Sequence, residues 1–288
     1  MLIQSRNRNF AGAPLERRHW CGDAYSTALY NALSTTFPRA ERFFITTLRK
    51  FSDGVPDQLR REIQAFCQQE AVHSREHHLF NRALSGSDCD LSKLDARINM
   101  VIDRISKQPD IMQLCATMCI EHITAVMSRE LIANPAHLAK ADAEQRKLWL
   151  WHASEEVEHK GVAYDTWLHA TQGWSRWRRW STKATFMAKI SMGFALNRSR
   201  GVVELLRQEG YSAPRAILGL AHYTLISPGM LRRTFPAWCE FFLPGFHPWN
   251  SDDRALINRA ESEYAAAMPD AAVAVREHPK KAMVRNAA

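Results

Sequence analysis

The sequence predicts an all-α protein: a four-helix bundle with additional C-terminal helices. Apolar residues recur at intervals of three and four along most of the 288-residue chain, and few stretches alternate with period two. The hydrophobic fraction of 46% is that of an ordinary globular protein, so the chain can bury a sizeable core. Prolines, glycines and capping residues divide this helical pattern into separate elements.

The first predicted hairpin joins a helix over 38–50 to a longer helix that starts at Asp57 and runs past Phe80. Proline at an early helical position opens the first helix, and a turn at 52–56 ends it. Glu41 lies about 14 Å of helical rise from Lys50, and Glu70 about 20 Å from Asp57. An antiparallel arrangement therefore brings the two carboxylates to similar heights.

The second predicted hairpin repeats this design. One helix runs from about Ile111 and ends before Asn134-Pro135, and Asp142 with Gln145 resembles a capping box that opens the next helix. Glu121 lies about 18 Å from the end of its helix, and Glu156 about 21 Å from the start of the next. These two glutamates also agree in height to within a turn.

Both hairpins carry a Glu-x-x-His unit preceded by a lone glutamate. Glu41 lies 29 residues before Glu70, and Glu121 lies 35 residues before Glu156. Positions i and i+3 project from one helical face, so each unit offers a carboxylate and an imidazole to the same point. This is the ligand set of a ferritin-like di-metal four-helix bundle. The predicted ligands on this pattern are Glu41, Glu70, His73, Glu121, Glu156 and His159.

The sequence leaves open which residue is the third histidine ligand of this site. His152 precedes Glu156 by four residues and continues the stripe formed by Glu156 and His159, so it is a further predicted ligand. His77, four residues after His73, is the competing candidate. The neighbouring polar residues on other helical faces are interpreted as solvated groups or as hydrogen-bond partners of the ligands: Glu76, His78, His122, Glu155 and Glu158.

Carboxylate-rich sites with few imidazoles suit iron or manganese, whereas structural zinc sites favour thiolates. We therefore expect two iron ions, with manganese or zinc as alternatives. Of the six cysteines, none forms a C-x-x-C pair, and the start of the chain lacks the apolar run of a secretory signal. A reduced, cytoplasmic protein is expected. Cys115 and Cys119 lie one helical turn apart and could bind a soft metal, but apolar packing is the favoured interpretation.

The formal net charge is +8, yet the sequence contains no recognised nucleic-acid motif, so we expect no nucleic-acid partner. Trp174–Trp180 interleaves three tryptophans with three arginines and precedes an apolar segment, Phe186–Phe194. Such a segment suits either peripheral contact with a membrane or packing on the outside of the bundle. No stretch is long enough for a spanning helix.

Four regions follow from these patterns. Residues 172–268 are interrupted at Gly201, Gly210, Pro214, Pro228 and Pro236, with a last helix over about 252–267. The predicted regions are 1–22, a mobile arm; 23–171, the di-metal bundle; 172–268, a C-terminal helical region packed on the bundle; and 269–288, a disordered basic tail.

Several motifs resemble a known bacterial family, the predicted metal-dependent hydrolases. The motifs, which span about residues 25–255, are Phe37-Pro-Arg-Ala-Glu-Arg-Phe-Phe44, Gln69–His78, Trp151–Lys160 and the turn Pro244–Trp249. The ligand pattern alone is also similar to ferritin-like di-iron proteins such as ribonucleotide reductase small subunits and the p-aminobenzoate N-oxygenase group. The latter resemblance implies His152 as an extra ligand, but no N-oxygenase substrate pocket is recognisable.

Three functions accord with this sequence. The first is a di-iron oxidase or oxygenase that activates O₂ toward a small, hydrophobic substrate. The second is a hydrolase of an ester or phosphate in which two metals activate water, as the family description implies. The third is a non-catalytic metal-binding helical scaffold. The first function would call for an electron-donor protein, and the bundle faces would allow a homodimer, but the residues specify neither partner.

Overall fold

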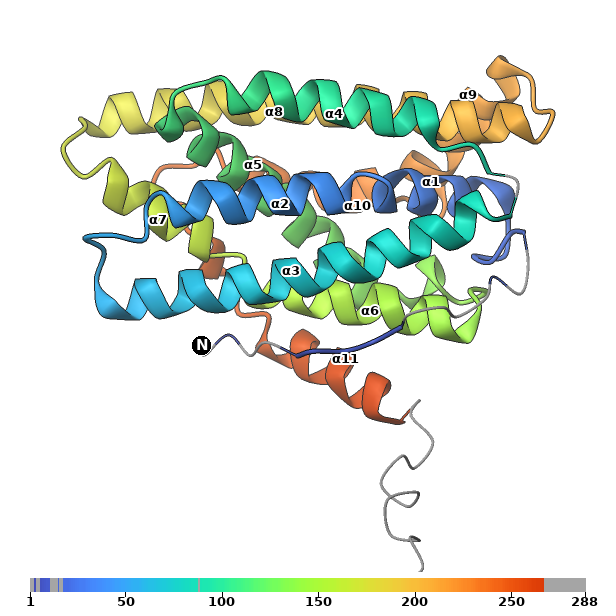
Figure 1. Cartoon of the computed structure of the whole chain (residues 1–288), viewed down its shortest axis with the longest axis horizontal. Coiled ribbons are helices and arrows are strands. Elements are labelled where there is room, and N and C mark those ends of the chain that lie inside the picture. The colour runs from blue at the N-terminus through green and yellow to red at the C-terminus, as the bar shows by residue number, and fades with distance from the viewer. Residues whose placement is uncertain (1–2, 4–5, 11–14, 16–17, 88, 267–288) are drawn as a thin grey trace, which may run out of the picture.

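The computed structural model describes residues 3, 6–10, 15, 18–87 and 89–266, and within these ranges it contains helices and no strand, which confirms the all-α prediction. Two antiparallel helical hairpins form its centre (Figure 1). The first hairpin consists of α2 (Phe37–Arg49) and α3 (Asp57–Ser85), and the second of α5 (Asp110–Ala133) and α6 (Ala143–Glu158). The bundle is thus built from the two predicted hairpins.

Local sequence signals place the ends of these helices. Pro38 lies in the first turn of α2, and Pro56 directly precedes α3, where a missing N–H and a fixed φ suit a helix start. Asp142 occupies the N-cap of α6 as predicted, but its side chain makes no capping bond. Its backbone N–H instead donates to the Trp20 carbonyl oxygen at 2.8 Å. The predicted capping box is therefore wrong.

Helix α6 ends earlier than its sequence pattern indicates. It stops at Glu158, and a short turn through Gly161 leads into α7 (Val162–Ala170). A Cβ atom on Gly161 would lie 2.7 Å from the Trp249 Nε1 atom, so only glycine permits this close approach. His159 is consequently the C-cap of α6 rather than a residue inside a helix.

The remaining elements surround the two hairpins. Helix α8 packs across α1 and α5, α10 covers α5, and α11 covers α6 (Figure 1). These elements are α1 (Ala24–Ser34), α4 (Ser92–Ser106), η1 (Pro135–His137), α8 (Arg176–Gln208), α9 (Ala213–Ala221), the π-helical turn η2 (His222–Ile226), α10 (Met230–Glu240), η3 (Pro248–Asn250) and α11 (Arg254–Ala266).

Two of the expected interruptions in the C-terminal region do not occur. Helix α8 continues through Gly201, whose missing side chain lets α8 approach α1: an added Cβ would lie 3.3 Å from Ala32 Cβ. Pro236 lies inside α10. Packing against neighbouring helices therefore overrides two local helix-breaking signals.

The segment 1–22, predicted as a mobile arm, is instead packed against the bundle in its described part. The Phe10 N–H donates to Glu76 Oε2 at 2.7 Å, and the Phe10 ring lies 5.2 Å from the Trp151 ring. Trp20 is fully buried. The described residues of this segment form a strap over α3 and α6. The predicted tail 269–288 lies outside the described residues.

The tryptophan and arginine segment at the start of α8 is divided between packing and exposure. Trp174 lies 5.5 Å from Trp167, and the Trp180 indole N–H donates to the Phe242 carbonyl oxygen at 2.8 Å. Trp177 is 71% exposed. Contrary to the expectation that no stretch is long enough, one described helix, α5, is long and apolar enough to cross a membrane. Most of its apolar stretch is buried in the bundle, which accounts for its composition.

Candidate metal centre

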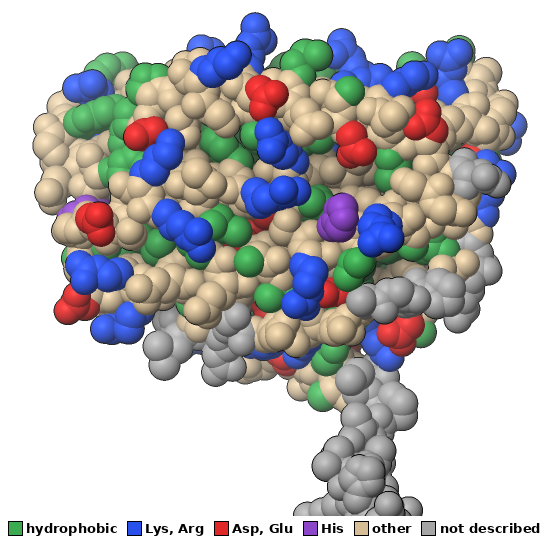
Figure 2. Space-filling view, viewed as in Figure 1, with side chains coloured by type: hydrophobic (Ala, Val, Ile, Leu, Met, Phe, Trp, Pro, Cys, Tyr) green, Lys and Arg blue, Asp and Glu red, His purple; other side chains and the backbone are tan. Residues whose placement is uncertain are grey.

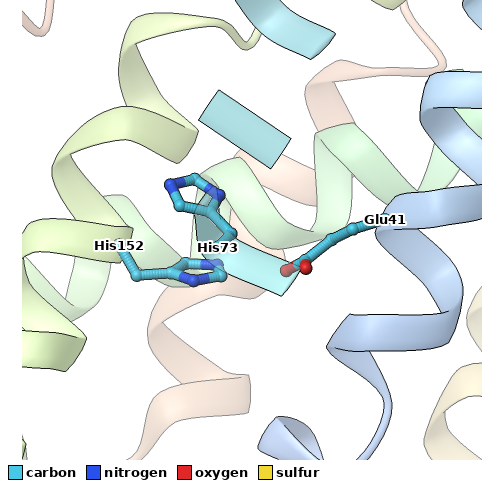
Figure 3. A group of neighbouring side chains, drawn as sticks. All are labelled: Glu41, His73 and His152. Atoms are coloured by element: carbon cyan, nitrogen blue, oxygen red, sulfur yellow. The ribbon is translucent and has the colours of Figure 1, made fainter. Parts of the chain in front are cut away.

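Seven predicted ligand side chains meet in the interior of the bundle, and none is more than 4% exposed. Figure 3 shows Glu41 from α2, His73 from α3 and His152 from α6 pointing toward one another. Helix α5 contributes the fourth carboxylate, and the end of α6 contributes a histidine. The assembled side chains are Glu41, Glu70, His73, Glu121, His152, Glu156 and His159.

The cluster is elongated and has two ends. Glu41, His73 and His152 form one end, where donor atoms lie within 4.8 Å of one another. Glu70 and Glu121 form the other end with His159, whose Nε2 lies 3.3 Å from an oxygen of each carboxylate. Glu156 lies between the ends, with Oε1 3.7 Å from His73 Nδ1 and 3.6 Å from His159 Nε2. The cluster thus contains more than one group of donor atoms that could hold a metal ion.

Most donor atoms of this cluster make no hydrogen bond to other described residues. Both oxygens of Glu41, Glu70 and Glu121 lack a hydrogen-bond partner among the described residues, as do His73 Nδ1 and His159 Nε2. Buried carboxylates without partners are costly, so a cluster of them calls for bound cations or protons. Oxygen and imidazole donors in this ratio fit iron or manganese. The residues present therefore fit a dinuclear metal site.

The electrostatics of the cluster support this interpretation. Burial, together with the nearby carboxylates of Glu70 and Glu156, raises the pKa of Glu41 well above its usual range. Burial and the same neighbours raise the pKa of Glu121 in the same way. Burial alone would also raise the pKa of Glu156, but His159 and His152 outweigh it and hold that pKa well below the usual range. Bound cations would replace the protons that Glu41 and Glu121 retain.

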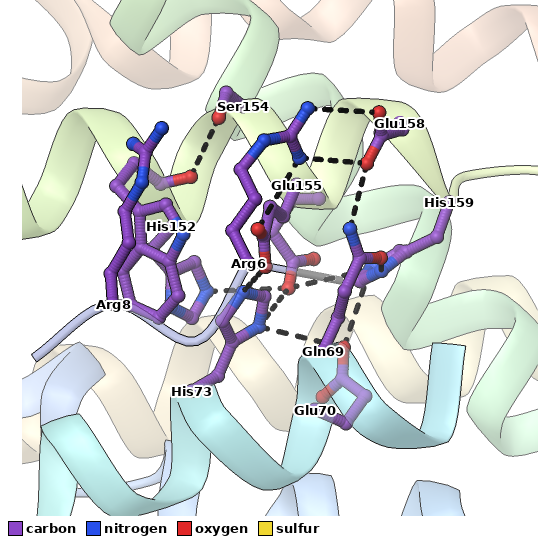
Figure 4. Close-up of polar contacts among 12 residues, drawn as sticks. Arg6, Arg8, Gln69, Glu70, His73, His152, Ser154, Glu155, Glu158 and His159 are labelled. Carbon is purple, nitrogen blue, oxygen red and sulfur yellow. Dashed lines mark hydrogen bonds and ion pairs between the residues drawn. The ribbon is translucent and has the colours of Figure 1, made fainter. Parts of the chain in front are cut away.

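Further hydrogen bonds fix the orientation of His73 and His159 (Figure 4). His73 Nε2 donates to Glu155 Oε2 at 3.0 Å, which leaves Nδ1 facing the cluster. His159 Nδ1 donates to Gln69 Oε1 at 3.1 Å, and Gln69 in turn donates to Glu158 Oε2 at 2.7 Å. Such partners hold the tautomer and orientation of a metal-binding imidazole. Glu155 and Glu158 are thus buried partners of ligands rather than solvated residues.

The two candidates for the third histidine occupy different layers. His152 Nε2 lies 3.2 Å from Glu156 Oε1 at the cluster. His152 Nδ1 is hydrogen-bonded to His77 Nε2 at 2.9 Å, and His77 Nδ1 to Ser34 Oγ at 2.8 Å. His152 therefore faces the cluster, whereas His77 lies behind it and orients it. Burial and His152 lower the pKa of His77 well below its usual range, so His77 is neutral.

Gln69 and Arg6 support the cluster but were not among the predicted site residues. Gln69 directly precedes a predicted ligand, so its position was a usable signal. The Arg6 guanidinium lies 3.3 Å from Glu155 Oε1 and 3.0 Å from Glu158 Oε2, where it compensates both carboxylates (Figure 4). No local sequence pattern predicts these contacts, because Glu155 and Glu158 lie 149 and 152 residues from Arg6 in the chain.

Replacing Arg6 by alanine is expected to weaken metal binding by roughly 10–100-fold, the usual cost of losing support for a ligand. Without the guanidinium, Glu155 and Glu158 lose a partner and hold His73 and Gln69 less firmly. Titration of the metal-free protein with a competing chelator measures the change. Arg8→Ala is the matched control, since Arg8 pairs with Glu261 and not with these two carboxylates. Equal affinities in the two variants would contradict this role.

Several other residues with polar or reactive side chains lie outside the cluster. Cys115 and Cys119 are fully buried thiols in an apolar core cluster, in agreement with apolar packing. The Tyr164 hydroxyl donates to the Phe246 carbonyl oxygen at 2.7 Å. His247 Nε2 is hydrogen-bonded to Asp165 Oδ1 at 2.9 Å and so pins the proline-rich turn to α7. His122 and His78 also lie elsewhere, the first buried and hydrogen-bonded to the Ala237 carbonyl oxygen, the second exposed.

A small, mostly apolar cavity of about 30 Å³ adjoins the first end of the cluster. His152 lines it, and the Phe37 ring stacks on His152 at 4.6 Å. Phe194 of α8 and Met230 of α10 also line it. A cavity of this size holds a water molecule or a small group, so a larger molecule would need these side chains to move.

The fold and the cluster define an all-α protein with a buried carboxylate and histidine site that can hold metal ions. The chain belongs to the family described as predicted metal-dependent hydrolases, whose model matches residues 4–252. No match was found among curated proteins or among solved structures.

Proposed function

We propose that the protein is a dinuclear non-haem metal enzyme, with two iron ions, that uses O₂ to oxidise or oxygenate a small hydrophobic substrate. The observation that carries this proposal is the cluster itself. It gathers four buried carboxylates and three imidazoles whose donor atoms have few or no other partners. When bound there, iron would supply the electrons for O₂ reduction, and the chain would supply the ligands and the shape of the pocket.

The surroundings of His152 support a hydrophobic substrate. Phe37, Phe194 and Met230 line the cavity next to this histidine, and such walls favour apolar groups. His152 itself is held between Phe37 and His77, so its Nε2 atom stays aimed at the cluster. The pocket therefore orients an apolar group toward one end of the cluster rather than toward its middle.

The second candidate function is hydrolysis of an ester or phosphate, and the family description favours it. Two divalent ions in the same cluster would lower the pKa of a shared water molecule and bind a leaving oxygen. The same ligands would serve in both reactions. The two functions differ in the metal that is bound and in the requirement for O₂.

The deciding experiment measures metal content and oxygen consumption of protein purified without a metal-affinity tag. After anaerobic loading with ferrous iron, we expect about two irons per chain, the content of a di-iron bundle, and rapid O₂ consumption with a change in the visible spectrum. His159→Ala should lose both properties, whereas His78→Ala, at an exposed position on α3, should keep them.

The remaining outcomes separate the alternatives. Stoichiometric zinc or manganese without any reaction with O₂ would replace the oxygenase proposal by hydrolysis and direct the search to esters and phosphates. Loss of metal with no effect on the protein's biological role would favour the non-catalytic scaffold. Absence of stoichiometric metal under all loading conditions would overturn both enzymatic proposals.

A further inference from the structure

The large hydrophobic side chains on the surface are unevenly distributed. Among the described residues, all the strongly exposed ones except Met100 come from residues 177–243. They are 44–71% exposed and belong to α8, α9, η2, α10 and the turn after α10. We call this set the apolar face: Trp177, Met192, Leu196, Ile217, Leu218, Leu225, Ile226, Leu231, Phe235 and Leu243.

Direct contacts join the elements of the apolar face. The Trp238 indole N–H of α10 donates to Ser191 Oγ of α8 at 2.8 Å, directly beside Met192. The Phe235 ring stacks on Trp238 at 5.6 Å. Arg232 Nε of α10 donates to the Leu225 carbonyl oxygen of η2 at 3.1 Å, and η2 continues directly from α9. These contacts hold α8, α10 and η2 together, so the exposed side chains come from neighbouring elements.

The charge around this face is predominantly positive. From Arg176 to Leu243 the chain has three acidic residues: Glu204 and Glu209 are paired at the far end of α8, and Glu240 is exposed at the end of α10. By contrast, the face in Figure 2, over α2, α3 and α4, mixes charges of both signs. The exposed basic residues of the segment are Arg176, Arg178, Lys189, Arg200, Arg207, Arg215, Arg232 and Arg233.

We propose that the apolar face binds the surface of an anionic lipid bilayer. Exposed apolar side chains would enter the boundary between headgroups and acyl chains, and the surrounding arginines would contact lipid phosphates. Trp177 has the amphipathic ring that such interfaces favour. This binding involves none of the predicted metal ligands, so it stands apart from the proposed enzymatic function.

A second copy of the chain fits this face less well than a bilayer does. A symmetric dimer places the same patch of both subunits in contact, so the arginines of one copy would face those of the other. An anionic bilayer supplies the opposite charge everywhere along the face. The charge pattern therefore favours lipid over self-association.

Co-sedimentation of the full chain with vesicles tests this proposal. Vesicles of phosphatidylcholine with about one-third phosphatidylserine should bind the protein, and pure phosphatidylcholine vesicles should bind it far more weakly. The double variant Leu218→Ser/Phe235→Ser should bind at least about tenfold more weakly, since two large apolar contacts are removed. Met100→Ser is the matched control, because Met100 is 71% exposed outside the apolar face, and it should bind like the wild type.

A charge variant separates the two contributions. Lys189→Gln/Arg215→Gln should weaken binding to anionic vesicles and leave binding to neutral vesicles unchanged, with circular dichroism showing that every variant is folded. Absence of binding to anionic vesicles would overturn the proposal, as would equal binding by wild type and the Leu218→Ser/Phe235→Ser variant. If the wild type is a dimer in sedimentation equilibrium and the Leu218→Ser/Phe235→Ser variant is a monomer, the partner of the apolar face is a second copy of the chain and not a bilayer.

Discussion

Replacing Glu121 by glutamine is expected to make the metal-free protein more stable and to abolish metal binding at one end of the cluster. Glu121 is buried beside three other carboxylates, and burial with these neighbours raises its pKa well above the usual range. Keeping a proton that the unfolded chain would release costs free energy, so we expect a gain in the free energy of unfolding at pH 7. Chemical denaturation of chelator-treated protein measures it.

The pH dependence of this gain has a defined sign. The folded protein keeps a proton on Glu121 that the unfolded chain releases above its ordinary pKa of 4.5, so the glutamate costs stability as pH rises beyond that value. The advantage of Glu121→Gln should therefore be absent below about pH 4.5 and grow toward neutral pH. An advantage that shrinks as pH rises would contradict this explanation.

Glu130→Gln, the same substitution on the same helix, is the control and should have the opposite effect. Glu130 Oε1 accepts hydrogen bonds from Asn134 and His137 at 3.0 and 3.1 Å and lies 3.7 Å from Arg233. Loss of these bonds to a charged acceptor should lower the free energy of unfolding by about 1–2 kcal/mol. Opposite effects of Glu121→Gln and Glu130→Gln would distinguish a carboxylate suited to bind metal from one that stabilises the fold.

Metal loading is expected to give the largest change in stability. A metal present at a thousand times its dissociation constant stabilises the folded state by about 4 kcal/mol. For a chain of this size that corresponds to a rise of roughly 10 °C in the melting temperature. Calorimetry of the metal-free and loaded protein measures the rise, which should be lost in a Glu70→Gln/His159→Ala variant.

The rise should also shrink as the pH is lowered. Protons compete with metal for Glu41 and Glu121, whose raised pKa values make them hold protons tightly. A rise that is independent of pH, or equal in the double variant, would show that metal binds elsewhere on the chain. A bound metal without any stabilisation would contradict a site formed by folding.

Local signals predicted the two hairpins closely because their ends depend on local residues. Pro38, Pro56 and Asn134 mark helix ends in these hairpins, so both ends of α2 and α5 and the start of α3 lie within a residue or two of expectation. The end of α6 depends instead on Trp249, which packs closely on Gly161 from a distant turn. Sequence patterns contain no information on such a contact.

In the candidate site, too, local spacing predicted some features, whereas others depend on distant contacts. Helical spacing was enough to group Glu70 with His73 and Glu156 with His159, and the structure brings all seven predicted ligands together. Whether these residues bind metal stays a prediction. The sequence left open whether Glu155 and Glu158 are solvated or hydrogen-bonded to the ligands, because that choice depends on their partners on α3 and the strap.

The strap has a consequence for the order in which the protein is completed during synthesis. Arg6 and Arg8 both reach Glu261 of α11, at 3.3 and 2.6 Å. All predicted ligands precede residue 160, so they leave the ribosome long before Glu261 does. The ligands can therefore gather while Arg6 still lacks one of its anchors, and the support around His73 and His159 becomes complete only when the last described helix has been made.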